Sequence, residues 1–542
     1  MILNSKTLTL GFFFALFLCI TFLPIAWMFG NSIYEHGNVS FIYYRDIFLT
    51  LKYVPVITNS LLFASLTTVM SCLMGIPTGF FLAKTLIPLN NFFKVCLLIP
   101  LIIPSYTTGI AWSGILGKTG FLNTFLSHYT PLSPGTISGF IYSVYGGAWV
   151  LSFNLYPVVM LITEYALKNI NPRLEESGLV TGNVFLTIRR ITLPLIAPAI
   201  LSGMMIVFVL ALSEFGVPSL LQINVLTTQV FTQFSAFYNE RAATASSFPL
   251  IAITVAFLII ELIYFRGKSF EILGRKPSSG TLKYHQKWLT IPGVIFCILT
   301  LSISIIIPLS ALIATAQTLS AYYDAFCLVK KSIQNSLLFG VIGATLLCVI
   351  GFFLGYLSEK IRTRLRNGIS SFIWVLFAIP ATVTGVGLIK LCNRPEGFLQ
   401  NIYSSWWIVI IGYVARFLPL SSRIMTNYFK QIPGSQEDAG AVTGISWFKI
   451  IQKIFLPLQF PGITTTWLMC FIFCVGELGT TILIYPPGHE TFPIALFTIM
   501  VNSPEHIVSA LSIIMMVITL LPVGIFLGIL KYFHKNNIFR QD

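Results

Sequence analysis

Two glutamates inside long apolar segments are the residues of this sequence best suited to chemistry. Glu214 and Glu477 each lie near one end of an apolar run, and a glycine follows each two residues later. A carboxylate inside a membrane span is costly and is by default a functional residue. Two carboxylates facing each other would suit a cation, whereas each alone could reach the membrane interface or cap a helix. Arg416 and Lys390 are further charges within apolar runs, and the sequence does not indicate which acid Arg416 contacts.

Two other patterns that resemble chemical motifs are incomplete. Cys470 and Cys474 lie four residues apart on one predicted helix, but no histidine or further cysteine joins them, so we interpret them as packing residues. Residues 117–119 read Gly-Lys-Thr, like the end of a phosphate-binding loop, but that motif needs a glycine where this sequence has Trp112. The sequence therefore predicts no catalytic residue in this chain and leaves any metal site unknown.

The composition predicts that these residues belong to an integral membrane protein. Hydrophobic residues make up 56% of the 542 residues and charged residues only 9%, compared with about 25% charge in soluble domains. The formal net charge is +15, but lysine and arginine fall in short gaps between apolar runs and not in a basic patch on a soluble fold. This distribution argues against nucleic acid as a partner and indicates the lipid bilayer.

Apolar runs long enough to cross a bilayer predict twelve membrane helices. A basic segment over 266–288 is predicted to be a cytoplasmic linker between two permease halves, 1–265 and 289–542. Lysine and arginine concentrate in alternate gaps, and this asymmetry predicts that both termini are cytoplasmic. The runs lie near residues 8–29, 59–83, 95–117, 139–165, 195–217, 245–265, 289–314, 334–357, 370–391, 405–428, 458–479 and 506–530.

The two sets of six runs repeat one unit. Ser60 matches Ser336 at an offset of 276 residues, and Glu214 matches Glu477 at 263, because the exterior loop after the third run is longer than its counterpart. An even number of spans gives both copies the same orientation. We therefore expect a pseudo-two-fold axis along the membrane normal, with a pathway between the halves.

A polar stretch on the predicted cytoplasmic side occurs once in each half. Residues 175–182 read EESGLVTG and residues 437–444 read EDAGAVTG, and each is followed by an amphipathic helix and by Leu-Pro, which is predicted to open the next span. Acidic and small residues suit a helix start, and Gly182 and Gly444 suit a turn or a close backbone approach. A membrane-surface helix packed against its own bundle is the alternative interpretation.

This repeated stretch resembles the coupling motif of ABC-importer permeases, in which Glu-Ala-Ala is followed three residues later by Gly and then by Ile-x-Leu-Pro. The resemblance implies that each stretch docks on one of two copies of a cytoplasmic ABC ATPase. That partner would use ATP and Mg²⁺, and this chain would bind no cofactor. The second copy has one extra residue before Leu-Pro, which leaves the register of its helix open. The implied coupling residues are Glu176, Gly182, Leu193, Pro194, Asp438, Gly444, Leu456 and Pro457.

Over nearly the whole chain the sequence is similar to the ferric-iron permeases that work with a periplasmic iron-binding protein. Segments 98–106, 213–218 and 476–492 carry this resemblance. Fe³⁺ is a hard cation that prefers oxygen ligands, so the resemblance implies a substrate pathway formed by Glu214, Glu477, Tyr106 and Ser105. Thiamine and polyamine permeases share the layout, and these substrates remain alternatives.

Together these observations predict an all-α polytopic membrane protein of the type I ABC-importer permease class (MetI-like), with two tandem six-helix halves and alternating access between them. The resemblance places it in the bacterial inner membrane and implies no enzymatic activity of its own. A secondary transporter with parallel halves would not need the repeated stretch. A membrane enzyme would need clustered His, Asp or Ser, whereas the six histidines are scattered.

Overall fold

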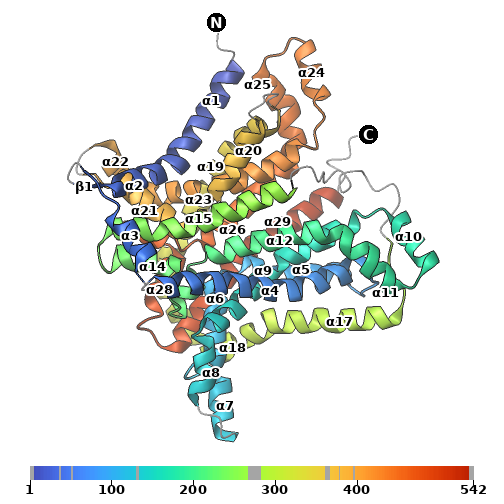
Figure 1. Ribbon diagram of the computed structural model, residues 1–542, viewed down its shortest axis with the longest axis horizontal. Helices are drawn as coiled ribbons and strands as arrows, with labels where there is room; N and C mark the ends of the chain where they lie inside the picture. Colours follow the sequence, from blue (N-terminus) through green and yellow to red (C-terminus); the bar gives the residue numbers. More distant parts are fainter. Residues whose placement is uncertain are drawn as a thin grey trace.

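The computed structural model describes residues 5–35, 38–50, 53–129, 134–265, 282–360, 366–377, 379–394 and 397–535. Most of the predicted linker, residues 266–281, lies outside these ranges. Within them the chain is helical apart from turns and one two-residue antiparallel hairpin, formed by β1 (Tyr34–Glu35) and β2 (Asn38–Val39). The prediction of an all-α fold is confirmed, and Figure 1 shows the helices gathered in one bundle.

The helices of the first half are, in order, α1 (Ser5–Phe17), η1 (Leu18–Phe22), α2 (Leu23–Ile33), α3 (Ile42–Leu49), α4 (Val54–Lys84), α5 (Asn90–Ile102), α6 (Ser105–Leu116), α7 (Phe121–Tyr129), α8 (Pro134–Ile141), α9 (Val144–Lys168), α10 (Pro172–Thr181), α11 (Val184–Thr187), η2 (Ile188–Thr192), α12 (Leu193–Leu212), α13 (Gly216–Leu220), α14 (Leu226–Ser235) and α15 (Glu240–Phe265).

The helices of the second half are α17 (Lys287–Leu301), η3 (Ser302–Ile306), α18 (Ile307–Ala316), α19 (Leu319–Lys360), α20 (Arg366–Phe377), α21 (Ala381–Cys392), α22 (Phe398–Tyr403), α23 (Trp407–Phe429), α24 (Ser435–Val442), α25 (Trp447–Ile450), η4 (Ile451–Phe455), α26 (Leu456–Gly476), α27 (Thr481–Ile484), α28 (Phe492–Ile499) and α29 (Glu505–Lys535).

Within the described ranges, nine helices are long and apolar enough to span a membrane, and the number is ten if α5 and α6, which meet at an angle of 93°, are counted as one bent span. The other two predicted spans correspond to α15 and to the pair α20 and α21. One boundary differs clearly, because α19 begins at Leu319, whereas hydropathy predicts a start near 334. The helix continues into this more polar stretch because no glycine or proline interrupts residues 319–334.

Four of the spans contain a single π-helical turn, and each turn ends shortly before a proline. The turns η1, η2, η3 and η4 precede Pro24, Pro194, Pro308 and Pro457. Proline cannot donate a backbone hydrogen bond, and its ring clashes with the carbonyl of the preceding turn. A wider turn relieves that clash, so the helix continues instead of breaking.

Each half is built around one pair of tightly packed helices. In the first half α4 packs along α9, and a Cβ atom on Gly75 would lie 2.7 Å from the carbonyl oxygen of Tyr156. In the second half α19 packs along α23, and a Cβ on Gly355 would lie 2.6 Å from Cβ of Met425. Small residues allow such close helix contacts in membranes. These glycines therefore determine how closely the central helices approach.

The first span of each half packs against the other half. The N-terminal span contacts α19, α21 and α23 of the second half, and the rings of Phe13 and Phe353 stack with centroids 4.2 Å apart. The α17–α18 span contacts α4, α5 and α6 of the first half, and a Cβ on Gly293 would lie 2.8 Å from the Phe81 ring. Figure 1 shows α17 alongside α4, and α1 beside α19 and α20. The halves are therefore interlocked.

Equivalent contacts in the two halves agree with the predicted repeat. Ser60 Oγ accepts a hydrogen bond of 2.8 Å from the backbone N–H of Leu226, at the start of α14. Ser336 Oγ accepts one of 2.6 Å from the N–H of Phe492, at the start of α28. Each serine thereby holds the start of a short helix against the long helix of its own half.

Candidate functional site

Loop 1, residues 171–194, is a hairpin formed by the short helix α10 and the first turns of the long helix that begins at Val184. The side chain of Asn171 accepts a hydrogen bond from the N–H of Arg173, and that of Asn183 accepts one from the N–H of Leu186, so both helices are capped. A Cβ on Gly178 would lie 2.6 Å from Cδ1 of Ile191, so this glycine allows α10 to pack closely on the following helix.

A buried ion pair fastens loop 1 to the end of α4. Lys84 Nζ lies 2.5 Å from Glu175 Oε2, and both side chains have no exposed surface. Thr192 donates a hydrogen bond of 3.0 Å to the other oxygen of Glu175. The N–H of Tyr284, in the last part of the linker, donates to the carbonyl of Lys84 at 2.7 Å. Burial raises the pKa of Tyr284 to about 12, so its phenol stays neutral near the Glu175 carboxylate.

Loop 2, residues 434–457, is likewise a short helix, α24, followed by the start of a long helix, but different contacts hold it in place. Glu437, the counterpart of Glu175, accepts hydrogen bonds from Lys6 Nζ at 2.8 Å and from the Tyr356 hydroxyl at 2.5 Å. Lys360, the counterpart of Lys84, instead donates to the carbonyl of Ile432 at 2.5 Å. A Cβ on Gly440 would meet Ile454 Cδ1 at 3.0 Å, as at Gly178 in loop 1.

The predicted coupling residues lie on the outer surface of the two loops. Glu176 and Asp438 are exposed, whereas their neighbours Glu175 and Glu437 are the acids with internal partners. The apolar side chains of Val180 and Val442 are 87% and 88% exposed. Each loop thus presents one exposed acid and one exposed apolar side chain on its surface. Sequence reasoning overlooked the anchoring roles of Glu175 and Glu437, although their alignment with each other indicated matched roles.

The turn and Leu-Pro positions differ from the prediction. Leu193-Pro194 and Leu456-Pro457 do not open a new span, because each lies inside one continuous helix that begins at Val184 or Trp447. The extra residue of loop 2 lies in the turn before α25, so the helix register is preserved. Gly444 adopts φ +73° there, whereas Gly182 is extended at φ −157°. Only Gly444 needs the conformational freedom of glycine.

Glu214 and Glu477 occupy equivalent positions beyond the far ends of these continuous helices. Glu214 Oε1 accepts hydrogen bonds from Ser105 Oγ at 2.7 Å and from the N–H of Gly216 at 3.0 Å. The two carboxylate oxygens of Glu477 accept from the N–H groups of Thr480 and Thr481, at 2.6 and 3.0 Å. Each glutamate therefore starts the next short helix, which is the capping role that the sequence left open.

Both glutamates also lie where the two halves meet. A Cβ on Gly479 would lie 3.6 Å from Cβ of Phe215, and one on Gly476 would lie 3.4 Å from Cγ of Pro104. Tyr106 is 3% exposed, its hydroxyl has no hydrogen-bond partner among the described residues, and it lies within electrostatic range of both carboxylates. The predicted pathway residues are thus brought together at the interface between the halves.

Arg416 lies within electrostatic range of Glu477 and Glu214. Its guanidinium donates hydrogen bonds to the carbonyls of Phe377 and Ile379, at the break between α20 and α21. Asn154, its counterpart in the first half, donates to the carbonyl of Ile103 at 3.0 Å, at the break between α5 and α6. In both halves a side chain of the long helix therefore donates hydrogen bonds to backbone carbonyls at the helix break, but only in the second half does that side chain carry a positive charge.

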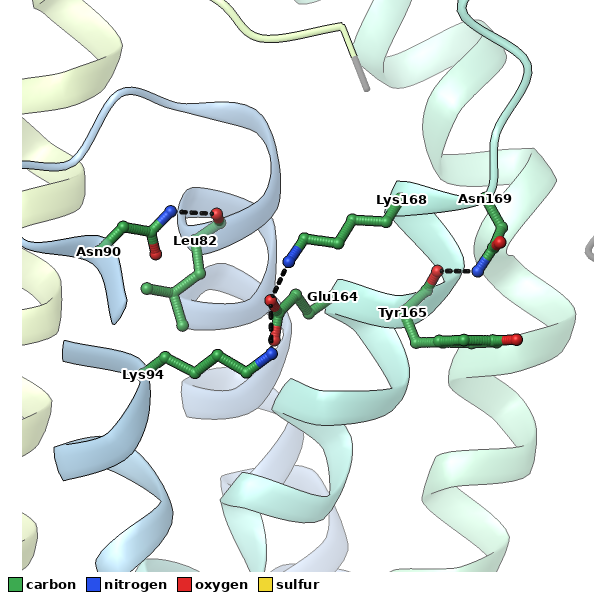
Figure 2. Close-up of polar contacts among 7 residues, drawn as sticks. All are labelled: Leu82, Asn90, Lys94, Glu164, Tyr165, Lys168 and Asn169. Carbon is green, nitrogen blue, oxygen red and sulfur yellow. Dashed lines mark hydrogen bonds and ion pairs between the residues drawn. The ribbon is translucent and has the colours of Figure 1, made fainter. Parts of the chain in front are cut away.

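Two further groups of charged residues in the described spans involve neither Glu214 nor Glu477. Figure 2 shows Glu164, 4% exposed, between Lys94 of α5 at 3.0 Å and Lys168 of α9 at 2.5 Å. Lys390 forms an ion pair with Glu240 of α15, which joins the two halves. Glu164 was not predicted from the sequence, although an acid inside an apolar run was the available signal. These pairs tie helices together.

Comparisons with known proteins agree with the repeat. A family model for the inner membrane component of binding-protein-dependent transport systems matches residues 75–268 and 348–538. The Fe(3+)-transport system permease protein FbpB 2 of Haemophilus influenzae is 24% identical, over 90% of this chain and 92% of that protein. A putative ferric transport system permease protein, FbpB 1, of the same organism is 26% identical over 78% and 69%. The spermidine/putrescine permease protein PotC of Escherichia coli is 23% identical over 36% and 71%.

Proposed function

Since the chain belongs to the family of binding-protein-dependent transport system inner membrane components, we propose that it moves ferric iron that is delivered by a periplasmic binding protein. The family is one of transport permeases, so this chain is a two-half ABC-importer permease of the inner membrane and not an enzyme. Iron is favoured because the ferric permeases align with most of this chain, whereas the polyamine permease aligns with 36% of it.

The main observation that supports this proposal is a continuous helix in each half that links an exposed loop to a glutamate at the interface between the halves. The helix that starts at Val184 ends at Leu212, two residues before Glu214, and the one that starts at Trp447 ends at Gly476, directly before Glu477. A helix of this length spans about 44 Å. Each helix therefore joins an exposed loop at one end of the bundle to a carboxylate at the interface between the halves.

We infer that loops 1 and 2 are cytoplasmic and dock on two copies of an ABC ATPase. The exposed acids Glu176 and Asp438 and the bare side chains of Val180 and Val442 would contact the ATPase. That partner would bind ATP and Mg²⁺, so that this chain needs no cofactor, and both termini would be cytoplasmic. Movement of an ATPase subunit would displace one continuous helix, and the two helices together would alternate access to the interface.

The cargo would pass the interface at Glu214, Glu477 and Tyr106. Carboxylate and phenol oxygens are hard ligands that suit Fe³⁺. Two carboxylates and one guanidinium leave the site with one net negative charge, so a cation is attracted while Arg416 limits how tightly it is held. Ser105 would orient Glu214 through its hydrogen bond of 2.7 Å.

Uptake of radioactive ferric iron, thiamine and spermidine in cells that lack this chain would test the proposal. We expect that iron uptake alone is lost, and that the wild-type chain restores it whereas the double variant Glu214→Gln/Glu477→Gln does not. Glutamine retains one side-chain oxygen, which can accept the capping hydrogen bonds made by Glu214 Oε1 and one of the two made by Glu477, so the variant should still insert. Asp324→Asn, an exposed acid on α19, is the matched control. Unchanged iron uptake with loss of another cargo would refute the assignment of iron.

Coupling is tested separately by the double variant Glu176→Ala/Asp438→Ala. These residues are exposed on loops 1 and 2, so their loss should leave the permease inserted but reduce both capture of the ATPase and uptake. Normal uptake by this variant would refute the docking role of the two acids.

A further inference from the structure

We propose that Lys6, at the start of the first half, is a positioning residue for loop 2 in the second half. The two loops would then be held by different means, one internal to its own half and one supplied by the other half. The proposal rests on the function proposed above, in which both loops dock on an ATPase.

Loop 1 is fastened within its own half. Lys84 and Glu175 both come from residues 54–192, both are fully buried, and Thr192 adds a second donor to the carboxylate. Outside the first half, this arrangement is contacted by Tyr284 of the linker, whose N–H donates to the carbonyl of Lys84 and whose phenol, neutral because its pKa is raised to about 12, lies near Glu175. The charge that neutralises Glu175 is therefore independent of the second half.

Loop 2 receives its charge from the other half. Lys360 is the equivalent of Lys84, but it donates to the carbonyl of Ile432 and does not pair with Glu437. Lys6 is instead the cation that pairs with Glu437, because its Nζ lies 2.8 Å from Glu437 Oε1. The same Nζ lies 5.2 Å from the centre of the Tyr356 ring.

The contact made by Lys6 reaches the start of the loop 2 helix. Tyr356 donates to Glu437 at 2.5 Å and accepts a hydrogen bond of 3.3 Å from the Trp447 indole N–H. Trp447 begins the continuous helix that ends at Gly476, before Glu477. Lys6 therefore acts on that helix through Glu437, Tyr356 and Trp447.

The two fastenings differ in access to solvent. The side chains of Lys6 and Glu437 are 30% and 17% exposed, whereas those of Lys84 and Glu175 are fully buried. Salt screens exposed charge pairs more effectively than buried ones. Loop 2 is therefore the loop whose position responds to ionic strength and to movement of the first span.

A charge reversal tests this assignment on the chain alone. Ile450 is 3% exposed inside loop 2, so a cysteine placed there, in a background carrying Cys19→Ser and Cys327→Ser, should react slowly with a maleimide. Cys96, which is partly exposed, is also replaced by serine so that the label reports the new cysteine. We expect Lys6→Glu to raise the labelling rate about fivefold. Lys6→Arg should keep the low rate, and combining Lys6→Glu with Glu437→Lys should restore it. Lys287→Glu, at the exposed start of the equivalent span α17, is the matched control and should have no effect.

Capture of the ATPase and iron uptake are then measured on the full complex. Loss of both in Lys6→Glu, with recovery in the charge-reversed pair, would support the positioning role. Unchanged labelling in Lys6→Glu, or a pair that does not recover, would overturn it. If the wild-type chain captures no ATPase while the labelling changes as expected, the proposed docking function fails and the positioning of loop 2 by Lys6 stands.

Discussion

The ion pair between Lys84 and Glu175 gives a quantitative prediction for the stability of the bundle. Both side chains are fully buried and lie 2.5 Å apart. Removing one partner of such a pair leaves an uncompensated buried charge and costs about 3–5 kcal/mol, whereas replacing both partners costs far less. We therefore expect Lys84→Met and Glu175→Gln each to lower the free energy of unfolding by about 4 kcal/mol, and the double variant to lose less than either single variant.

The equivalent lysine of the second half is the control for this prediction. Lys360 is only half-buried and donates to a backbone carbonyl. Lys360→Met should therefore cost about 1.5 kcal/mol, the loss of one charged hydrogen bond. Unfolding by sodium dodecyl sulfate in mixed micelles, followed by circular dichroism, measures all four variants. A loss for Lys360→Met as large as that for Lys84→Met would refute the argument from burial, as would a double variant less stable than both single variants.

Two further predictions concern glycines. Gly75→Ala should destabilise the protein by about 1–3 kcal/mol, because its Cβ would lie 2.7 Å from a backbone oxygen, whereas Gly114→Ala, with nothing within 4 Å, should be neutral in the same unfolding measurement. Gly444→Ala should cost about 1–2 kcal/mol at its φ of +73° and weaken ATPase capture, whereas Gly182→Ala at φ −157° should do neither. Equal effects of the two loop variants in a pull-down would contradict the second prediction.

The fold could be predicted from the sequence because its main signals are long and redundant. Apolar runs of about 20 residues report membrane spans directly, and matched pairs along the chain, such as Ser60 with Ser336 and Glu214 with Glu477, indicated the repeat. Hydropathy failed at Leu319 because it measures burial in lipid and not helix formation. The sequence also predicted that a new span begins at Leu193 and at Leu456. In the structure a π-helical turn before each proline allows the helix to continue.

The site was predicted only in part, because sequence spacing does not report which side chains meet. The grouping of Glu214, Glu477 and Tyr106 agrees with the structure. The anchoring acids beside Glu176 and Asp438, which are the fully buried Glu175 and the partly buried Glu437, were overlooked, because the sequence alone does not show which of two adjacent carboxylates has internal partners. The contact between Lys6 and Glu437 joins residues 431 positions apart, and no local pattern could indicate it.

The interlocked first spans impose an order on assembly in the cell. The span that begins at Ser5 leaves the ribosome long before the helices on which it packs, because α19, α21 and α23 are synthesised more than 300 residues later. The surface that it uses for these contacts is exposed to lipid until those helices are inserted. The surface of α4, α5 and α6 is likewise exposed until α17 and α18 are inserted. Neither half can reach its final packing by itself, and the mature bundle forms only when the second half has entered the membrane.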